Sequence, residues 1–263
     1  MAYGLTALGA HRLLPRGIEP LRAVQAMVGP DVPAGGSLAV MRANHKERFV
    51  VLLMDAAGQP TKVAKVALSE AGRTALDREA SAVTTIACHL EAPLSGPRLL
   101  AHRPGVLVTA AIPWRMRRLP WLLPADVAAS LGAFFRTTQT GHGDCAPWNL
   151  LWTGSGWTLV DWEAADTEAA PLTDVFHFVV QGYALLKRPR LGAILAGLNG
   201  KGWVGQALRA YSEAAAISLD GTTQLLQTYL LATQGRLDPE APGERAGWHA
   251  RQRLLHALTR IRR

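Results

Sequence analysis

The segment from His142 to Asn149 reads HGDCAPWN, and it constrains the fold of this 263-residue chain more than any other stretch. A run with helical spacing, Asp126–Thr138, precedes it, and the apolar LLW and the strand-like GWTLVD follow it. We therefore expect a tight polar loop that leaves a helix and leads into a strand. Such a loop holds Asp144, Asn149 and Asp161 on one short piece of backbone.

These three side chains have the chemistry that phosphoryl transfer requires. Asp144 on a tight loop can accept the proton of a substrate hydroxyl or orient that hydroxyl. Asn149 lies five positions further on, so the loop can turn back and aim the amide oxygen at a metal ion. Asp161 ends the strand and offers a carboxylate, and oxygen ligands of this kind suit Mg²⁺. His142 is expected to hydrogen-bond the loop backbone, with Asp144 as the base.

The first part of the chain predicts an antiparallel sheet with a helix inserted between its strands. Short apolar runs bounded by polar or Gly/Pro-containing turns are typical of strands, and residues spaced three or four apart are typical of a helix. A short helix is expected around Glu19–Met27. The next elements should be strands at Ser37–Arg42, Arg48–Asp55 and Thr61–Leu68, a helix at Glu70–Leu90, and strands at Arg98–Ala101 and Val106–Ala110.

The rest of the chain is expected to be mostly helical. A connector rich in Pro, Trp and Arg, Pro113–Pro124, leads to the helix before the central motif. Beyond Leu172 the helical pattern is broken at Gly200–Gly202 and Asp238–Gly243.

In the pattern His142-Gly143-Asp144, Asn149 and Asp161, the chain resembles the aminoglycoside phosphotransferase and choline kinase family, whose members share the protein-kinase fold. The order of three strands, a helix and two strands is similar to the small lobe of that family. The resemblance implies an α+β, bilobal, protein-kinase-like fold. Residues 1–110 would form a nucleotide-binding lobe with a five-stranded antiparallel sheet plus a helix, and residues 111–263 a mostly helical catalytic and substrate lobe.

The resemblance also implies a nucleotide site in the small lobe, with ATP or GTP as the phosphoryl donor and Mg²⁺ as the cofactor. Lys65 shares a strand face with Val63 and Ala67, where it would reach the α and β phosphates, and Glu79 on the following helix would be its partner. Lys62 lies on the opposite face. Asn44 is similar to the asparagine often found in the family's phosphate-covering turn. Thr109–Ile112 falls where the family's hinge contacts the base, so Thr109 and Ile112 are candidate nucleotide contacts.

The acceptor is left open by the sequence. The net charge of +8 and the pI near 10.1 are typical of a GC-rich genome, or indicate a preference for anionic partners. Arg115, Arg117 and Arg118 in the connector favour a neutral sugar, an acidic metabolite or an acidic peptide over a cationic aminoglycoside. Asp174 resembles the aspartate that braces the catalytic loop in the family.

Two functions therefore remain open. The first is a phosphotransferase acting on a hydroxyl of a small molecule (antibiotic, sugar or amino-alcohol type), or of Ser or Thr in a biosynthetic peptide. The alternative is a catalytically silent kinase-like module that binds a peptide or a partner protein, for which the glycine-free turn at Ala43–Glu47 and the basic connector are the support. The basic C-terminal segment lacks interleaved aromatic residues, which argues against nucleic-acid binding.

A cytoplasmic, membrane-free location is expected. The sequence contains no run of about 18 apolar residues, and its start lacks the pattern of a secretory signal. Two cysteines, Cys88 and Cys145, do not suggest a disulfide framework and fit a reducing compartment.

Overall fold

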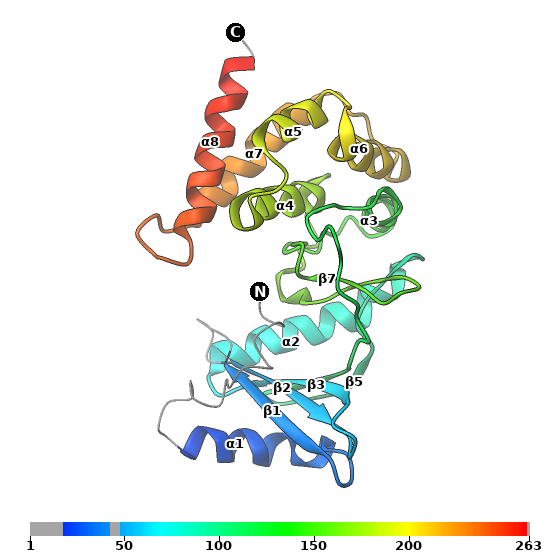
Figure 1. The fold of residues 1–263 in the computed structure, drawn as a ribbon, viewed down its shortest axis with the longest axis vertical. Coiled ribbons are helices and arrows are strands. Elements are labelled where there is room, and N and C mark those ends of the chain that lie inside the picture. Colours follow the sequence, from blue (N-terminus) through cyan, green and yellow to red (C-terminus); the bar gives the residue numbers. More distant parts are fainter. Residues whose placement is uncertain (1–17, 43–47, 262–263) are drawn as a thin grey trace. The chain divides into compact units, whose positions relative to one another are not determined.

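The structure is a computed structural model that describes residues 18–42 and 48–261. The chain divides into two compact units (Figure 1). Unit 1 comprises Met1–Thr85 and Pro97–Pro113, and unit 2 comprises Ile86–Gly96 and Trp114–Arg263. Each unit has its own sheet and its own buried core, so each is described by itself.

Unit 1 is built on a five-stranded antiparallel sheet in the order β1-β2-β3-β6-β5. Two helices cover it, α1 (Ile18–Val28) on one face and α2 (Glu70–Thr85) on the other (Figure 1). The predicted order of strands and helices is confirmed. The strands are β1 (Ser37–Arg42), β2 (Arg48–Met54), β3 (Pro60–Ala67), β5 (Leu99–Arg103) and β6 (Val106–Ala110).

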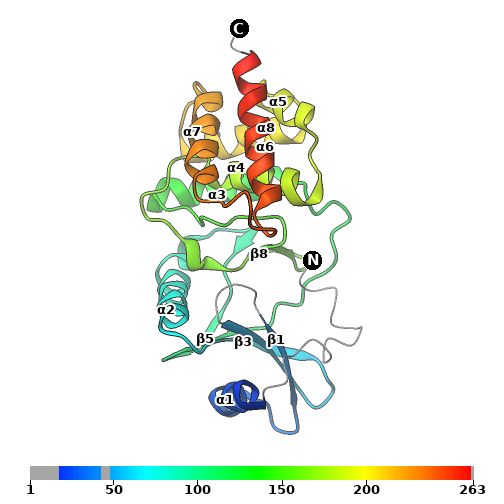
Figure 2. The ribbon, with the colours of Figure 1, turned by 90° about the vertical axis from the view of Figure 1, so that its left-hand side faces the viewer.

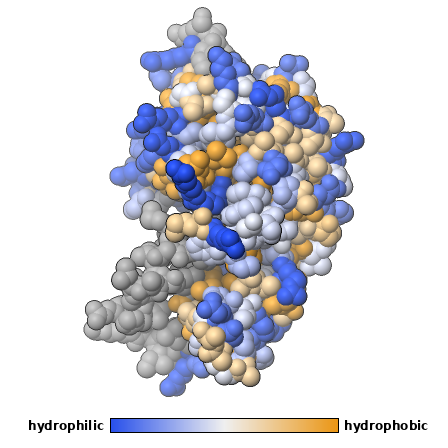
Figure 3. Space-filling model, turned by 45° about the vertical axis from the view of Figure 1, so that its right-hand side comes forward, coloured by the Kyte–Doolittle hydropathy of each residue, from blue (hydrophilic) through white to orange (hydrophobic). Residues whose placement is uncertain are grey.

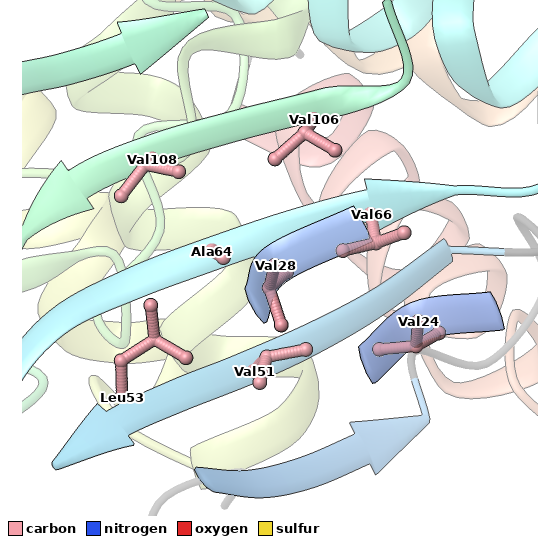
Figure 4. Close-up of a cluster of buried hydrophobic side chains, with 8 residues drawn as sticks. All are labelled: Val24, Val28, Val51, Leu53, Ala64, Val66, Val106 and Val108. Atoms are coloured by element: carbon pink, nitrogen blue, oxygen red, sulfur yellow. The ribbon is translucent and has the colours of Figure 1, made fainter. Parts of the chain in front are cut away.

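The two faces of the sheet carry separate apolar clusters because successive side chains of a strand point to opposite faces. Figure 4 shows the cluster beneath α1, in which Val24 and Val28 of the helix meet buried side chains of three strands, β2, β3 and β6. On the other face, Leu76 and Ala80 of α2 pack against Ala67 and Leu107. Lys65, which alternates with Ala64 and Val66, is therefore on the face that α2 covers.

Unit 2 combines a small sheet with a set of packed helices (Figure 2). The sheet has the order β4-β8-β7, where β4 (Leu94–Ser95) runs parallel to β8 (Trp157–Leu159), and β7 (Leu150–Trp152) runs antiparallel to it. The helix α3 (Ala125–Thr138) precedes the sheet. The later helices are α4 (Thr173–Gln181), the π-helix η5 (Gly182–Leu186), α5 (Leu191–Leu198), α6 (Gly202–Ala215), α7 (Thr222–Gln234) and α8 (Arg245–Ile261).

Two local predictions from the sequence are wrong, and one strand was missed. The helix expected to reach Leu90 ends at Thr85, because the chain turns through η3 (Ala87–His89) to bring Leu94 beside β8. The strand β4 was not foreseen, since it has only two residues and its partner is about sixty positions away. The strand expected to reach Asp161 ends at Leu159, because the Trp162 indole folds back and donates to the Leu159 carbonyl (2.7 Å).

On the face of the molecule that Figure 3 shows, polar and apolar side chains are interspersed. In unit 2 the connector exposes three large apolar side chains, Trp114, Met116 and Leu119, and Met116 is 87% exposed. No helix within residues 18–42 and 48–261 has the length and apolar character to cross a membrane.

Candidate functional site

The loop that carries Asp144 is held in place by a buried carboxylate. Asp174, in the first turn of α4, accepts two backbone N–H groups of the loop, from His142 (2.9 Å) and Gly143 (3.1 Å). Gly143 has a φ of 77°, and a Cβ there would lie 1.9 Å from the carbonyl oxygen of Ala164. Only glycine satisfies both demands, so the Gly between His142 and Asp144 is required by the shape of the loop.

His142 supports the loop and does not face solvent. Its Nε2 lies 3.0 Å from the Val160 carbonyl, and the Asp144 N–H donates to its Nδ1 (3.2 Å). A ring that accepts at Nδ1 must carry its proton at Nε2, which is the tautomer that can donate to Val160. Burial lowers the pKa of His142, and the nearby Asp174 and Asp144 oppose that shift only in part. The hydrogen bonds to the loop backbone are the supporting role expected for His142 from the sequence.

Asp144 has both carboxylate oxygens engaged yet remains accessible. Its Oδ1 is 2.9 Å from Nε2 of His177, and its Oδ2 accepts from Nδ2 of Asn149 (3.1 Å). Its side chain is 35% exposed, whereas His177 is buried. A carboxylate of this kind can still accept a substrate hydroxyl, because two hydrogen bonds use only part of its lone-pair capacity.

The sequence analysis missed His177 and the residues behind it. Nδ1 of His177 is 3.0 Å from the Tyr229 hydroxyl, and burial raises the pKa of Tyr229 to about 12. The hydroxyl therefore keeps its proton and can donate to Nδ1, in which case the Nε2 that faces Asp144 is the proton-bearing nitrogen of the ring. Arg251, buried on α8, hydrogen-bonds Tyr229 in turn. A signal was available: His177 follows Asp174 by three positions, so both lie on one face of the helix that packs on the loop.

Asn149 and Asp161 supply oxygen atoms suited to a hard divalent cation. Asn149 is buried and donates its amide N–H to the Asp144 carbonyl (2.9 Å), which leaves the amide oxygen as its acceptor group. Asp161 has φ 71° and ψ 60°, a left-handed conformation that is costly for a residue with a Cβ. One carboxylate oxygen of Asp161 and one of Glu163 lie within 4.8 Å of each other. These donors fit Mg²⁺ chemistry, and Glu163 is a ligand candidate that the sequence analysis did not name.

In unit 1 the structure brings Lys65 and Glu79 together. Nζ of Lys65 is 2.6 and 2.7 Å from the two carboxylate oxygens of Glu79. Glu79 is almost completely buried on α2, while the Lys65 side chain is 21% exposed. Lys62, on the other face of β3, donates to the Asp31 carbonyl (2.9 Å). The alternation of β3 thus separates the two lysines, and only Lys65 meets a carboxylate of α2.

The remaining predicted nucleotide contacts are placed as follows. Thr109 lies in β6, in register with Val63 of β3 and Leu99 of β5, and Ile112 lies just beyond the strand and is half-buried. The backbone N–H of residue 111 donates to the Thr61 carbonyl (2.9 Å). Asn44 lies outside the described residues.

Of the three connector arginines, Arg117 is used to hold the loop of unit 2. Its guanidinium donates to the carbonyls of Pro147 (3.4 Å), Leu150 (3.5 Å) and Leu122, and it lies over the Trp157 ring at 4.7 Å. Burial lowers the pKa of Arg117 to about 10. Arg115 and Arg118 remain exposed. The basic character that the sequence analysis gave to the connector is therefore carried by those two side chains.

No family model and no curated protein matches the chain. Solved structures do resemble it. One is a protein from Thermobifida fusca YX-ER1 assigned as a fructosamine-3-kinase, with 13% identity, a TM-score of 0.52, and 85% of this chain and 92% of that chain covered. Another is the aminoglycoside phosphotransferase APH(2'')-Ib with ADP bound, with 9% identity, a TM-score of 0.51, and 90% and 96% covered. The chain thus has the bilobal fold of the aminoglycoside phosphotransferases and protein kinases.

Proposed function

We propose that the chain is a Mg²⁺-dependent phosphotransferase that moves the γ-phosphoryl group of ATP or GTP to an alcohol. The observation that carries the proposal is Asp144 itself. Its loop is fixed by Asp174, its carboxylate is held by His177 and Asn149, and a third of its side chain is open to solvent. A rigid, accessible carboxylate beside metal-type oxygen donors is what phosphoryl transfer to a hydroxyl needs.

In the proposed reaction the acceptor hydroxyl binds to Asp144. The hydroxyl oxygen attacks the γ-phosphorus, a new P–O bond forms, and the bond to the β–γ bridging oxygen breaks. The proton of the hydroxyl passes to the Asp144 carboxylate, and the electron pair of the broken bond stays with the leaving nucleoside diphosphate.

The other residues have positioning roles in this proposal. Asn149, Asp161 and Glu163 would hold Mg²⁺, which neutralises charge on the phosphates when it is bound. In unit 1, Lys65 would bind the α and β phosphates, and Glu79 would fix the direction of its side chain. Thr109 and Ile112 would contact the base, and Asn44 the phosphates. Residues 1–110 and 111–263 would act as the nucleotide lobe and the catalytic lobe.

The proposed acceptor is a hydroxyl-bearing small molecule or a Ser or Thr of a biosynthetic peptide. The two solved neighbours support the first option, since one is named a fructosamine kinase and the other an aminoglycoside phosphotransferase. A cytoplasmic location is proposed with it, because that is where nucleoside triphosphates are supplied.

The test is a phosphoryl-transfer assay with labelled ATP or GTP on a panel of antibiotics, sugars, amino alcohols and peptides. Asp144→Ala should lower turnover by about 10²–10⁴-fold, the range for loss of a positioned base. Asp220→Ala removes an exposed aspartate elsewhere in unit 2 and should leave turnover unchanged. Turnover that survives in Asp144→Ala would contradict the assignment.

A silent binding module remains the second candidate, and the exposed Trp114, Met116 and Leu119 favour it, because exposed apolar side chains can receive a partner chain. Nucleotide binding separates the two. A nucleotide present at 100 times its Kd should stabilise the fold by about 2.7 kcal/mol. If millimolar nucleotide with Mg²⁺ does not raise the melting temperature, the binding module is favoured.

A further inference from the structure

Unit 2 contains a pocket of about 340 Å³ away from the Asp144 loop. It lies between η5 with the turn that follows it, the start of α5, and α8. Four basic side chains and an apolar surface line it. The basic side chains are Lys187, Arg190, His249 and Arg253, and the apolar surface includes Leu191 and Ala250.

The basic side chains come together for reasons visible in the sequence. Ala246, His249, Ala250 and Arg253 are spaced by three, four and seven positions, so they form one face of α8. Two basic residues of the C-terminal helix, His249 and Arg253, therefore line this pocket. Arg251 and Leu254 of the same helix are buried.

The charge in the pocket is not neutralised by the protein. Among the described residues that line it, none is acidic. The side chains of Arg190 and Arg253 make no hydrogen bond or ion pair with any described residue, and the Lys187 Nζ donates to the Ala184 carbonyl (2.7 Å). Like charges that converge in a partly apolar hollow repel one another, and an anion in the pocket would relieve that repulsion.

The pocket is built on the same elements as the Asp144 loop. Its π-helix continues directly from α4, which carries Asp174 and His177. A Cβ at Gly182 would lie 2.6 Å from the Arg188 carbonyl oxygen and 3.6 Å from Pro147 of the loop, so the backbone beside the pocket packs closely on that loop. On α8, Ala250 lines the pocket and the next residue, Arg251, hydrogen-bonds Tyr229 behind His177.

We propose that this pocket binds the anionic part of the acceptor, a carboxylate or phosphate group on a small, partly apolar molecule. The proposal rests on the phosphotransferase function for the identity of the occupant as the acceptor. Its volume lies within the usual range for small-molecule sites, roughly 300–1,000 Å³. The arginines supply planar, multidentate donors for the anion, and Leu191, Ala250 and Tyr183 supply the apolar surface.

The binding test uses calorimetry without nucleotide on four probes that share one ring: phenyl phosphate, benzoate, benzyl alcohol and benzylamine. Phenyl phosphate or benzoate should bind, and the comparison of the two identifies the preferred anion. The double variant Arg190→Gln/Arg253→Gln should weaken binding at least about tenfold, the loss expected for charge-assisted hydrogen bonds. The matched control Arg236→Gln/Arg260→Gln removes two exposed arginines that do not line the pocket and should bind as the wild type does.

Three results would overturn the proposal: no binding of either anion at millimolar concentration, equal weakening in the control pair, or equal binding of benzylamine. The transfer assay separates this failure from failure of the proposed function. If acidic alcohols are phosphorylated, the pocket double variant should raise their KM and leave kcat nearly unchanged. Transfer without anion binding refutes the pocket alone. Anion binding that depends on Arg190 and Arg253, without transfer to any acceptor, refutes the phosphotransferase alone.

Discussion

Asp161 has a backbone conformation that glycine adopts more easily than other residues. Comparing the stabilities of Asp161→Gly and Asp161→Ala therefore tests this conformation. The φ of 71° at Asp161 places the Cβ close to the following carbonyl, a cost of about 1–2 kcal/mol for a residue with a side chain. Glycine avoids that cost but loses about 0.4–1 kcal/mol through the greater freedom of the unfolded chain. We expect Asp161→Gly to be more stable than Asp161→Ala by about 0.8 kcal/mol, the difference between the midpoints of these two ranges.

The pair is designed so that other effects cancel. Both variants lose the carboxylate and every interaction it makes, and they differ only in the Cβ. Stability is measured by urea unfolding, followed by the fluorescence change as buried tryptophans such as Trp162 become exposed. Asp166 provides the control, since its φ is not positive. There the order should reverse, and Asp166→Ala should be more stable than Asp166→Gly.

The same variants test the proposed metal role. Both Asp161→Gly and Asp161→Ala should lose Mg²⁺-dependent phosphoryl transfer, although one of them is folded more stably than the other. If Asp161→Ala equals or exceeds Asp161→Gly in stability, the left-handed conformation of Asp161 is refuted. If either variant keeps full turnover, the carboxylate is not a required metal ligand.

Three further predictions concern buried groups of unit 2. Burial lowers the pKa of His142, so the stability that comes from keeping this ring neutral is fully present above the unfolded pKa near 6.5 and is lost as the pH falls below it. In that range the free energy of unfolding should fall by up to about 1.4 kcal/mol per pH unit. Urea titrations at several pH values should show that His142→Gln lacks this part of the pH dependence. Burial also raises the pKa of the Cys145 thiol, whereas Cys88 is exposed, so a thiol reagent at pH 8 should modify one cysteine per native chain and both only after unfolding; two fast modifications would contradict this. Tyr229→Phe removes the donor to Nδ1 of His177 and should cost about 1–2 kcal/mol of stability and reduce turnover without abolishing it, and wild-type values in both assays would show that the hydrogen bond has no role.

The features that could be predicted from the sequence are those encoded locally. The alternation of Lys62, Val63 and Lys65 in β3 places the two lysines on opposite faces, and the helical spacing of α2 places Glu79 toward Lys65. The spacing of Asp144 and Asn149 implies a loop that closes on itself, and the amide of Asn149 does bond Asp144. In each case the interacting residues are near in sequence or lie on adjoining elements with a regular period.

The features that could not be predicted depend on distant partners. Helical spacing continues past Thr85, but the chain leaves the helix there so that Leu94 can pair with Trp157. His177, the distant partner of Asp144, lies on α4, and Tyr229, which contacts His177 from α7, comes 85 positions after Asp144 in the chain. A histidine or tyrosine on an amphipathic helix does not reveal which loop the folded helix will meet.

The distant partners also restrict the role that Asp144 can have. Nε2 of His177 lies 2.9 Å from one of its oxygens and Asn149 donates to the other, so the carboxylate is fixed from two sides before a substrate arrives. A carboxylate has about four acceptor positions, so a substrate hydroxyl can bind without displacing either donor. The position of the Asp144 carboxylate is thus fixed when unit 2 folds, by hydrogen bonds to other residues of that unit. This favours Asp144 as a preset acceptor for the hydroxyl, and its position should not depend on binding of the nucleotide.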